Sequence, residues 1–172
     1  MAAFDAGATC ATHLFNAMSQ LGNRDPGLVG AALAHGGVHA GIIADGIHVH
    51  PVSLQTAFAA KNGPGKIFLV TDAMATAGSD IVELNLNGRK IQRKNSRLTL
   101  ADGTLAGADL ELCTAISVLV NKANVPLDVA IMKATSIPKN LLSEPSAGLY
   151  SSRNEKEWNY IDESLLSIRA LT

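Results

Sequence analysis

Three short apolar segments that share one pattern constrain the fold more than any other feature of this sequence. Each passes from glycine through apolar residues into His, Asn or Asp, and the segments are residues 7–17, 39–48 and 65–74. In the third, the letters IFLV show no apolar–polar alternation, which is typical of a parallel strand covered on both faces. Residues 27–37 and 51–60, which lie between the segments, have helical patterns. The order strand, helix, strand, helix, strand predicts an α/β fold with parallel strands.

The pattern changes after the third segment. Residues 81–107 begin with alternating apolar and polar residues and contain the turn signals Asn87-Gly88 and Asp102-Gly103, which predict β-hairpin structure. Residues 108–125 predict a helix, and a second helix is expected from Pro126 through Met132. One face of the first helix is expected to carry Leu112, Ala115, Ile116, Leu119 and Val120. The first residues, MAAFDAGA, are typical of a helix that ends at Gly7.

Charge and composition exclude several kinds of partner. The 14 basic and 15 acidic residues give a net charge of −1 and are spread along the chain, so we expect neither nucleic acid nor a membrane surface as a partner. The two cysteines have no CxxC spacing, which fits a reducing compartment. No apolar run is long enough to span a bilayer. We therefore expect a cytoplasmic protein that acts on a small molecule.

Polar residues at the ends of the three expected strands are the first candidates for a functional site. They are His13, His48 and Asp72. A single histidine in such a place is more often structural than functional, but three polar residues at equivalent strand ends favour a site, because the carboxyl ends of parallel strands meet at one edge. Neutral imidazole binds Zn²⁺ or Fe²⁺, and a carboxylate can transfer protons during hydrolysis.

Other polar residues allow two interpretations. Arg24 lies in a turn, NRDPG, where its side chain is either a solvated loop charge or a planar fork for phosphate. His48 and His50 flank Val49 directly before Pro51, so we expect one ring in the cleft and the other outside it. His35 and the histidine at 39 flank a Gly-Gly turn and are expected to face solvent.

Five blocks in order, covering roughly residues 1–140, resemble a known enzyme family. The blocks are THLFNAM, GNRDPGLVGAAL, GIIADGIHVHP, VTDAMATAG and DGTLAGAD. Together they resemble N-acetylglucosamine-6-phosphate deacetylases, which are metal-dependent hydrolases of the amidohydrolase superfamily. The resemblance implies a partial TIM (β/α)₈ barrel, with about the last three barrel strands, their helices and a β-hairpin insertion. Residues 1–142 would form the carboxyl-terminal part of that barrel, followed by a divergent or truncated tail over 143–172.

The resemblance also implies a role for each matching residue. His13 matches a metal ligand, Asp72 matches the catalytic acid and base, and His48 matches a substrate-binding histidine that polarises the amide carbonyl. Further positions matching substrate contacts are Asn16, Ala17, Arg24, Leu105, Ala106 and Gly107. The implied cofactor is a divalent metal cation, Zn²⁺ in first place and Fe²⁺ or Co²⁺ as alternatives. The implied reaction converts N-acetyl-D-glucosamine 6-phosphate to D-glucosamine 6-phosphate and acetate.

The sequence departs from the family pattern in ways that leave alternatives open. The Glu and His that complete the family's metal site on earlier strands have no counterpart, and three strands are visible where a full barrel has eight. We therefore expect the chain alone to have little or no activity and to need either a missing amino-terminal half or a second copy in a homodimer. A non-catalytic fragment, or a sugar-phosphate-binding or assembly subunit, is the alternative. An amidohydrolase acting on another amide is a weaker one, because the NRDPG and TLAG blocks argue against it.

Overall fold

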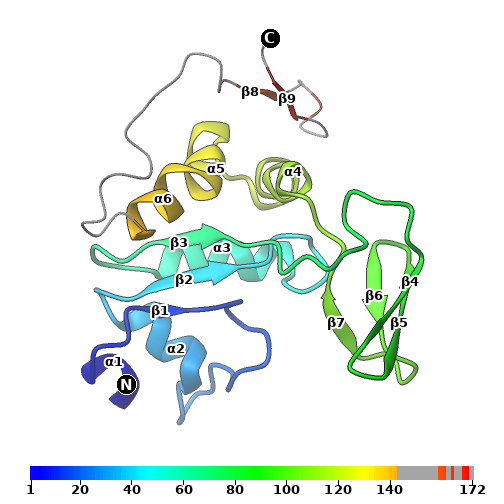
Figure 1. Cartoon of the computed structure of the whole chain (residues 1–172). Coiled ribbons are helices and arrows are strands. Elements are labelled where there is room, and N and C mark those ends of the chain that lie inside the picture. Colours follow the sequence, from blue (N-terminus) through cyan, green and yellow to red (C-terminus); the bar gives the residue numbers. More distant parts are fainter. Residues whose placement is uncertain (143–158, 162–163, 165–167, 171–172) are drawn as a thin grey trace.

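The computed structural model describes residues 1–142, 159–161, 164 and 168–170 (Figure 1). At its centre is a parallel sheet in the order β1-β2-β3, made of β1 (Cys10–Ala11), β2 (His39–Ile42) and β3 (Ile67–Leu69). Helix α2 (Gly27–Ala34) connects β1 to β2, and helix α3 (Pro51–Ala60) connects β2 to β3. The predicted α/β fold with parallel strands is confirmed, and α3 has both predicted bounds.

Three later helices pack beside this sheet (Figure 1). Helix α4 (Leu112–Ala123) packs against α3 and α5 (Leu127–Ala134), and α5 and α6 (Ser136–Leu142) contact β3. The two predicted helices are thus present, whereas α6 was not predicted. The expected buried face of α4 is wrong at its start, because Leu112 is exposed while Cys113 and Val118 are buried.

One apolar core joins the parallel sheet to its helices. Ile42 on β2, Leu54 on α3 and Leu119 on α4 are all fully buried within it. Burial of one such side chain stabilises the fold by roughly 1.5–3 kcal/mol. Ile43 and Ala44, which follow β2 directly, are fully buried as well. The core therefore holds the chain rigidly up to the carboxyl end of the central strand.

The amino-terminal helix α1 (Ala2–Asp5) is followed by Gly7 in the left-handed region, as the sequence predicts. The ring of Phe4 on α1 is buried and lies 5.7 Å from the ring of His35, centroid to centroid. The Nδ1 atom of His35 is itself buried. The expectation that His35 faces solvent is therefore wrong, because Phe4 covers its ring.

The residues predicted as β-hairpin structure form a four-stranded antiparallel sheet in the order β4-β5-β6-β7. Its strands are β4 (Glu83–Leu86), β5 (Arg89–Lys94), β6 (Arg97–Thr99) and β7 (Leu105–Ala108). Asn87 and Gly88 turn with positive φ, as predicted, and Asn95 and Ser96 form a further turn that the sequence did not indicate. Two of the alternating apolar residues in this region are exposed to solvent. They are Val82, just before β4, which is 69% exposed, and Leu86, at the end of β4, which is 47% exposed.

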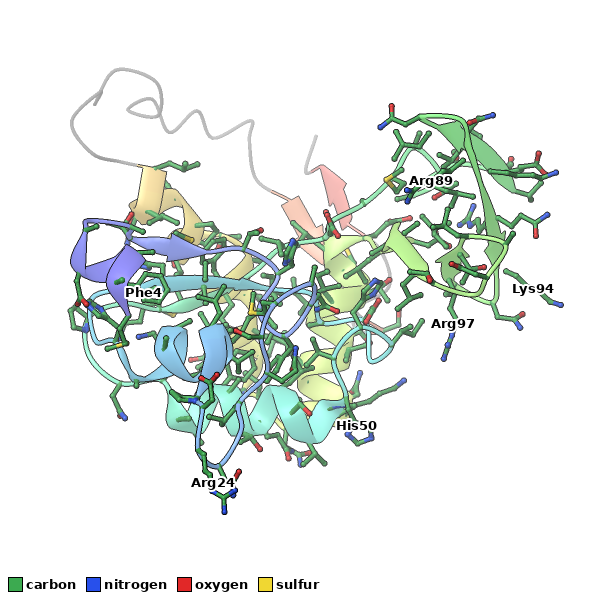
Figure 2. All side chains as sticks on the ribbon, turned by 90° about the horizontal axis from the view of Figure 1, so that it is seen from below. Phe4, Arg24, His50, Arg89, Lys94 and Arg97 are labelled. Carbon is green, nitrogen blue, oxygen red and sulfur yellow. The ribbon has the colours of Figure 1, made fainter. Side chains whose placement is uncertain are left out.

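Positive charge gathers on this antiparallel sheet. Five of the chain's 14 basic residues fall within residues 89–97, and Figure 2 shows Lys94 and Arg97 pointing outward from the sheet. Lys94 and Arg97 are direct partners across the turn between β5 and β6. The charges that are spread along the chain thus include one basic cluster, on this sheet.

Beyond residue 142 the structure describes two short strands. The strands β8 (Asn159–Ile161) and β9 (Ile168–Ala170) pair antiparallel. Apart from these strands and Ser164, the predicted divergent tail over residues 143–172 lies outside the described residues. Within the described part of the chain, the helices are all too short or too polar to cross a membrane.

Candidate active site

The carboxyl ends of the three parallel strands lie at one edge of the sheet, and two predicted site residues follow them directly. The segment that carries His13 runs alongside β2, because the backbone N–H of Leu14 donates to Gly41 O at 2.7 Å. On the other side of β2, the N–H of Val70 donates to Ile42 O at 3.1 Å and leads the chain toward Asp72. The chain segments that carry His13 and Asp72 thus leave the sheet on either side of β2, at the edge where parallel sheets form sites.

Three predicted site residues have a backbone that residues with a Cβ atom adopt uncommonly. The φ angles are 33° at His13, 50° at Ala17 and 53° at Asp72. Such left-handed conformations cost of order 1–3 kcal/mol each and are retained mainly at ligand-binding and catalytic sites. Their concentration after β1 and β3 supports a functional edge rather than ordinary loops.

His13 fits a metal ligand, but the described residues do not complete a three-ligand site around it. Its side chain is half-buried, and its Nδ1 atom is buried without a hydrogen-bond partner in the described structure. Such an atom is available to a metal ion. However, a catalytic zinc ion takes three protein ligands, and the described residues contain no group of three His, Cys, Asp or Glu side chains placed to hold one. The described residues therefore supply one candidate ligand and do not form a metal site.

His48 is held by a carboxylate that the sequence interpretation missed. Its Nδ1 atom lies 2.6 Å from Oδ2 of Asp45, and both side chains are only 7% exposed. The other oxygen of Asp45 accepts the backbone N–H groups of Ile47 at 2.8 Å and of His48 at 2.7 Å. The letters ADGIH carried a signal for this pair, an aspartate three residues before a histidine with a glycine between them.

The environment of Asp45 favours its ionised form. Burial by itself raises the pKa of the carboxyl group, but the hydrogen bond with His48 and those from the backbone outweigh burial, so the pKa lies below its usual value. The neighbouring His50 is exposed and caps α3, since its Nδ1 accepts the N–H of Val52 at 3.2 Å (Figure 2). The ring of His48 is therefore buried and that of His50 is exposed, whereas the place of His48 in a cleft stays a prediction.

The loop predicted to touch the sugar phosphate lies against the Asp72 segment. The N–H of Ala108 donates to Asp72 O at 2.8 Å, and the N–H of Met74 donates back to Ala108 O at 3.1 Å. Gly107 has a φ of 70°, and a Cβ atom there would lie 2.6 Å from Cγ of Met74 and 3.3 Å from Asp72 O. The site residues Leu105, Ala106 and Gly107 are thus brought to Asp72, whose side chain is exposed.

The two remaining groups of predicted residues lie on the chain between β1 and α2. Asn16 is half-buried, its N–H donates to His13 O at 2.8 Å, and its side-chain amide donates to Leu14 O at 3.3 Å. Ala17 beside it is exposed. Arg24 is also exposed, and Figure 2 shows its guanidinium pointing away from the body of the protein. Its contact with phosphate remains a prediction.

A cavity of about 520 Å³ lies between this edge and the antiparallel sheet. It is bordered by Asp45 on one side and by the ion pair of Arg93 with Asp109, 2.6 Å apart, on the other. His13, His48 and Asp72 are not among its lining residues. The cavity therefore borders Asp45 but does not bring the three predicted residues at the strand ends together.

Comparisons with known proteins point to one group of enzymes, although no family model matches the sequence. An N-acetylgalactosamine-6-phosphate deacetylase of Shewanella sp. (strain ANA-3) is 38% identical over 161 residues, which cover 94% of this chain and 41% of that protein. The N-acetylglucosamine-6-phosphate deacetylase of Bacillus subtilis (strain 168) is 44% identical over 107 residues, 62% of this chain and 27% of that protein. A protein of Escherichia coli (strain K12), provisionally named an N-acetylgalactosamine-6-phosphate deacetylase, is 34% identical over 76% of this chain and 77% of its own length.

Solved structures give the same result. The N-acetylglucosamine-6-phosphate deacetylase of Pasteurella multocida superposes with a TM-score of 0.78 at 32% identity, over 83% of this chain and 37% of that chain. A variant of the Mycobacterium smegmatis enzyme, in complex with N-acetyl-D-glucosamine 6-phosphate, superposes with a TM-score of 0.76 at 32% identity. The match covers 84% of this chain and 39% of that chain. The chain thus spans about two fifths of the length of these proteins, which agrees with the prediction that it corresponds to part of one.

Proposed function

Since the chain belongs to the family of N-acetylglucosamine- and N-acetylgalactosamine-6-phosphate deacetylases, we propose that it carries the substrate-binding and acid–base side of such an active site. The reaction is hydrolysis of the acetamido group of N-acetyl-D-glucosamine 6-phosphate to D-glucosamine 6-phosphate and acetate, a step of amino-sugar catabolism. The relative from Shewanella is named for the galactosamine substrate, so the epimeric sugar phosphate is the second substrate to test.

The observation that carries this proposal is the contact between Asp72 and the strand that contains Gly107. The hydrogen bond from Ala108 N to Asp72 O, 2.8 Å long, places a proposed acid–base residue beside the proposed sugar-phosphate loop. These two segments are distant in sequence and were assigned to one site from the sequence alone. Their contact supports a common ligand.

The proposed roles follow from the chemistry of each group. Asp72 takes a proton from the attacking water and then delivers it to the leaving nitrogen, because that nitrogen has to be protonated to leave as a free amine. His48 stabilises the negative charge that develops on the acyl oxygen, a role suited to a ring whose orientation is fixed. Asn16, Ala17 and the loop with Gly107 bind the sugar. Arg24 is proposed for the phosphate because of its planar donors.

For the metal ion, we propose a single ligand from the described residues. His13 would bind a divalent cation, Zn²⁺ before Fe²⁺ or Co²⁺, and its buried, unpartnered Nδ1 atom supports that role. The described residues do not complete the site, so further ligands have to come from a second copy in a homodimer or from additional polypeptide. In the same way, we propose that β1, β2 and β3 are three strands of a (β/α)₈ barrel, and that the protein acts in the cytoplasm.

The absence of a three-ligand group from the described residues favours a second candidate function. In this alternative the chain binds a sugar phosphate or takes part in assembly, without catalysis. Arg24, Asn16 and the loop Leu105 to Gly107 would keep their roles, and Asp72 would have none.

The two functions are distinguished by an assay of the purified full chain with added Zn²⁺. Release of acetate from N-acetylglucosamine 6-phosphate and its galactosamine epimer is measured beside an Asp72→Asn variant of equal fold and stability. Turnover that is lost in the variant supports the deacetylase and shows that the metal site is completed by association or by residues outside the described part. Binding without turnover, unchanged in the variant, supports the non-catalytic function instead.

A further inference from the structure

We infer that Asp45 is a positioning residue for His48: it holds the imidazole with the Nδ1 proton directed at its own carboxylate and leaves Nε2 as the nitrogen offered to a ligand. The inference deepens the proposed function and rests on it, because His48 is the residue proposed to contact the acyl oxygen. The sequence analysis did not identify this pair. It follows from contacts within the loop after β2.

Both oxygens of the Asp45 carboxylate are engaged in one small loop. Oδ1 accepts two backbone N–H groups, from Ile47 at 2.8 Å and from His48 at 2.7 Å, and so closes the turn. Oδ2 lies 2.6 Å from Nδ1 of the His48 ring. An ionised carboxylate only accepts hydrogen bonds, so the proton between these two atoms belongs to Nδ1. One residue thus sets both the backbone position and the tautomer of His48.

The loop that holds the pair is itself fixed at both ends. Ile43 and Ala44, directly before Asp45, are fully buried, and Val49 after His48 is 3% exposed. Between the paired residues, Gly46 has a φ of 73°, which glycine adopts without strain. With both side chains 7% exposed, water competes little for the hydrogen bond. The ring therefore has one orientation, and loss of the bond would leave the buried Oδ2 atom of Asp45 without a hydrogen-bond donor.

The fixed orientation has a chemical consequence. Nε2 is the ring nitrogen left for a ligand, and it accepts a hydrogen bond from the neutral ring or donates one from the doubly protonated ring. In the donating state it can stabilise an oxyanion, and the Asp45 carboxylate balances the charge of the ring. This is the arrangement by which a buried carboxylate orients a histidine in hydrolases of other folds.

The variant Asp45→Asn tests the inference without removing the loop's own hydrogen bonds. The amide oxygen of the asparagine can still accept the N–H groups of Ile47 and His48, so its NH₂ group faces the ring. Because an NH₂ group only donates, Nδ1 has to give up its proton, and the proton moves to Nε2. The variant is therefore expected to reverse the tautomer while the fold is retained.

The tautomer is read directly by ¹⁵N NMR of the histidine rings in the full chain, at a pH where the imidazole is neutral. The signals of His48 are identified by their loss in a His48→Gln variant. We expect the Nδ1-protonated form in the natural chain and the Nε2-protonated form in Asp45→Asn. The matched control is Asp102→Asn, because Asp102 also accepts a backbone N–H, from Thr104 at 2.9 Å, but contacts no histidine. It should leave His48 unchanged.

An Nε2-protonated ring in the natural chain, or the same tautomer in Asp45→Asn, would overturn the inference. Titration with N-acetylglucosamine 6-phosphate, at a pH where the natural ring is doubly protonated, adds a second readout. Asp45→Asn should then bind about tenfold more weakly or worse, because it lacks the carboxylate that balances the charge of the donating ring, and the control should not change. If the sugar phosphate binds to neither the natural chain nor the control, the proposed function fails. The tautomer still decides the role of Asp45 in that case.

Discussion

Replacing Gly107, on β7, by alanine should destabilise the protein more than the same change at a glycine in an open turn of the antiparallel sheet. Two costs add at this position. A left-handed backbone costs a residue with a Cβ atom about 1–2 kcal/mol, and the φ of Gly107 is 70°. The added methyl group would also lie 2.6 Å from Cγ of Met74 and 2.9 Å from its sulfur. Forcing such an overlap costs about 1–3 kcal/mol. The expected loss of unfolding free energy is therefore about 2–5 kcal/mol.

Urea denaturation of matched variants separates the two costs. Gly103→Ala is the control, because Gly103 has a φ of 85° and no atom within 4 Å of the position of a Cβ. Its free energy of unfolding should fall by the backbone contribution alone, about 1–2 kcal/mol. Adding Gly107→Ala to a Met74→Ala variant should then cost only the backbone part, because the side chain that the new methyl group would overlap is gone. If Gly107→Ala destabilises the chain no more than Gly103→Ala does, the packing of this strand against the Asp72 segment is wrong.

Three further predictions concern the core, the charge of Asp45 and the metal. Leu54→Ala should cost about 2–5 kcal/mol in urea denaturation, since Leu54 is fully buried, whereas Val52→Ala on the same helix, 59% exposed, should change stability by less than about 0.5 kcal/mol. The pKa of Asp45 is lowered in the folded chain, so the stabilisation that its carboxylate gives to the fold is present above the unfolded pKa of about 3.9 and is lost as the pH falls below it. In Asp45→Asn the thermal unfolding midpoint should therefore fall less on acidification. An equal fall in both proteins would contradict the hydrogen bond between Asp45 and His48. EDTA should leave the thermal midpoint unchanged, because the described residues hold no three-ligand metal site that could contribute to folding; a lower midpoint would show that such a site exists.

The parallel part of the fold could be predicted from the sequence because local signals and burial agree there. The strand around Ile67 is apolar throughout, and α3 has a proline at its first position, so its start needs no tertiary information. The turn at Asn95 and Ser96 was missed for the opposite reason. Both residues have positive φ without a glycine to announce it. The helical period also predicted wrongly that Leu112, at the start of α4, is buried. At a helix end, the elements that pack against it decide which side chains are buried.

The candidate site was predicted only as a set of residues and not as a set of contacts. The positions of His13 and Asp72 at parallel strand ends follow from the strand order, which the sequence indicates. The bond between Asp45 and His48 does not follow, because it depends on the loop geometry that the buried Ile43 and Ala44 impose. Likewise, no local signal indicates that Ala108 contacts Asp72, since that contact joins β7 to the segment after β3, far away in the sequence.

The central claim is that the strand ends and the loop with Gly107 form one site for an N-acetylated sugar phosphate. It is tested most directly by NMR titration of the full chain with N-acetylglucosamine 6-phosphate, with glucose 6-phosphate as the control that lacks the acetamido group. The account predicts that the signals of Asn16, His48 and Gly107 shift together along one saturable curve, and that the control shifts the His48 ring less. Shifts confined to the basic residues 89–97, or separate curves for the three signals, would contradict a common site.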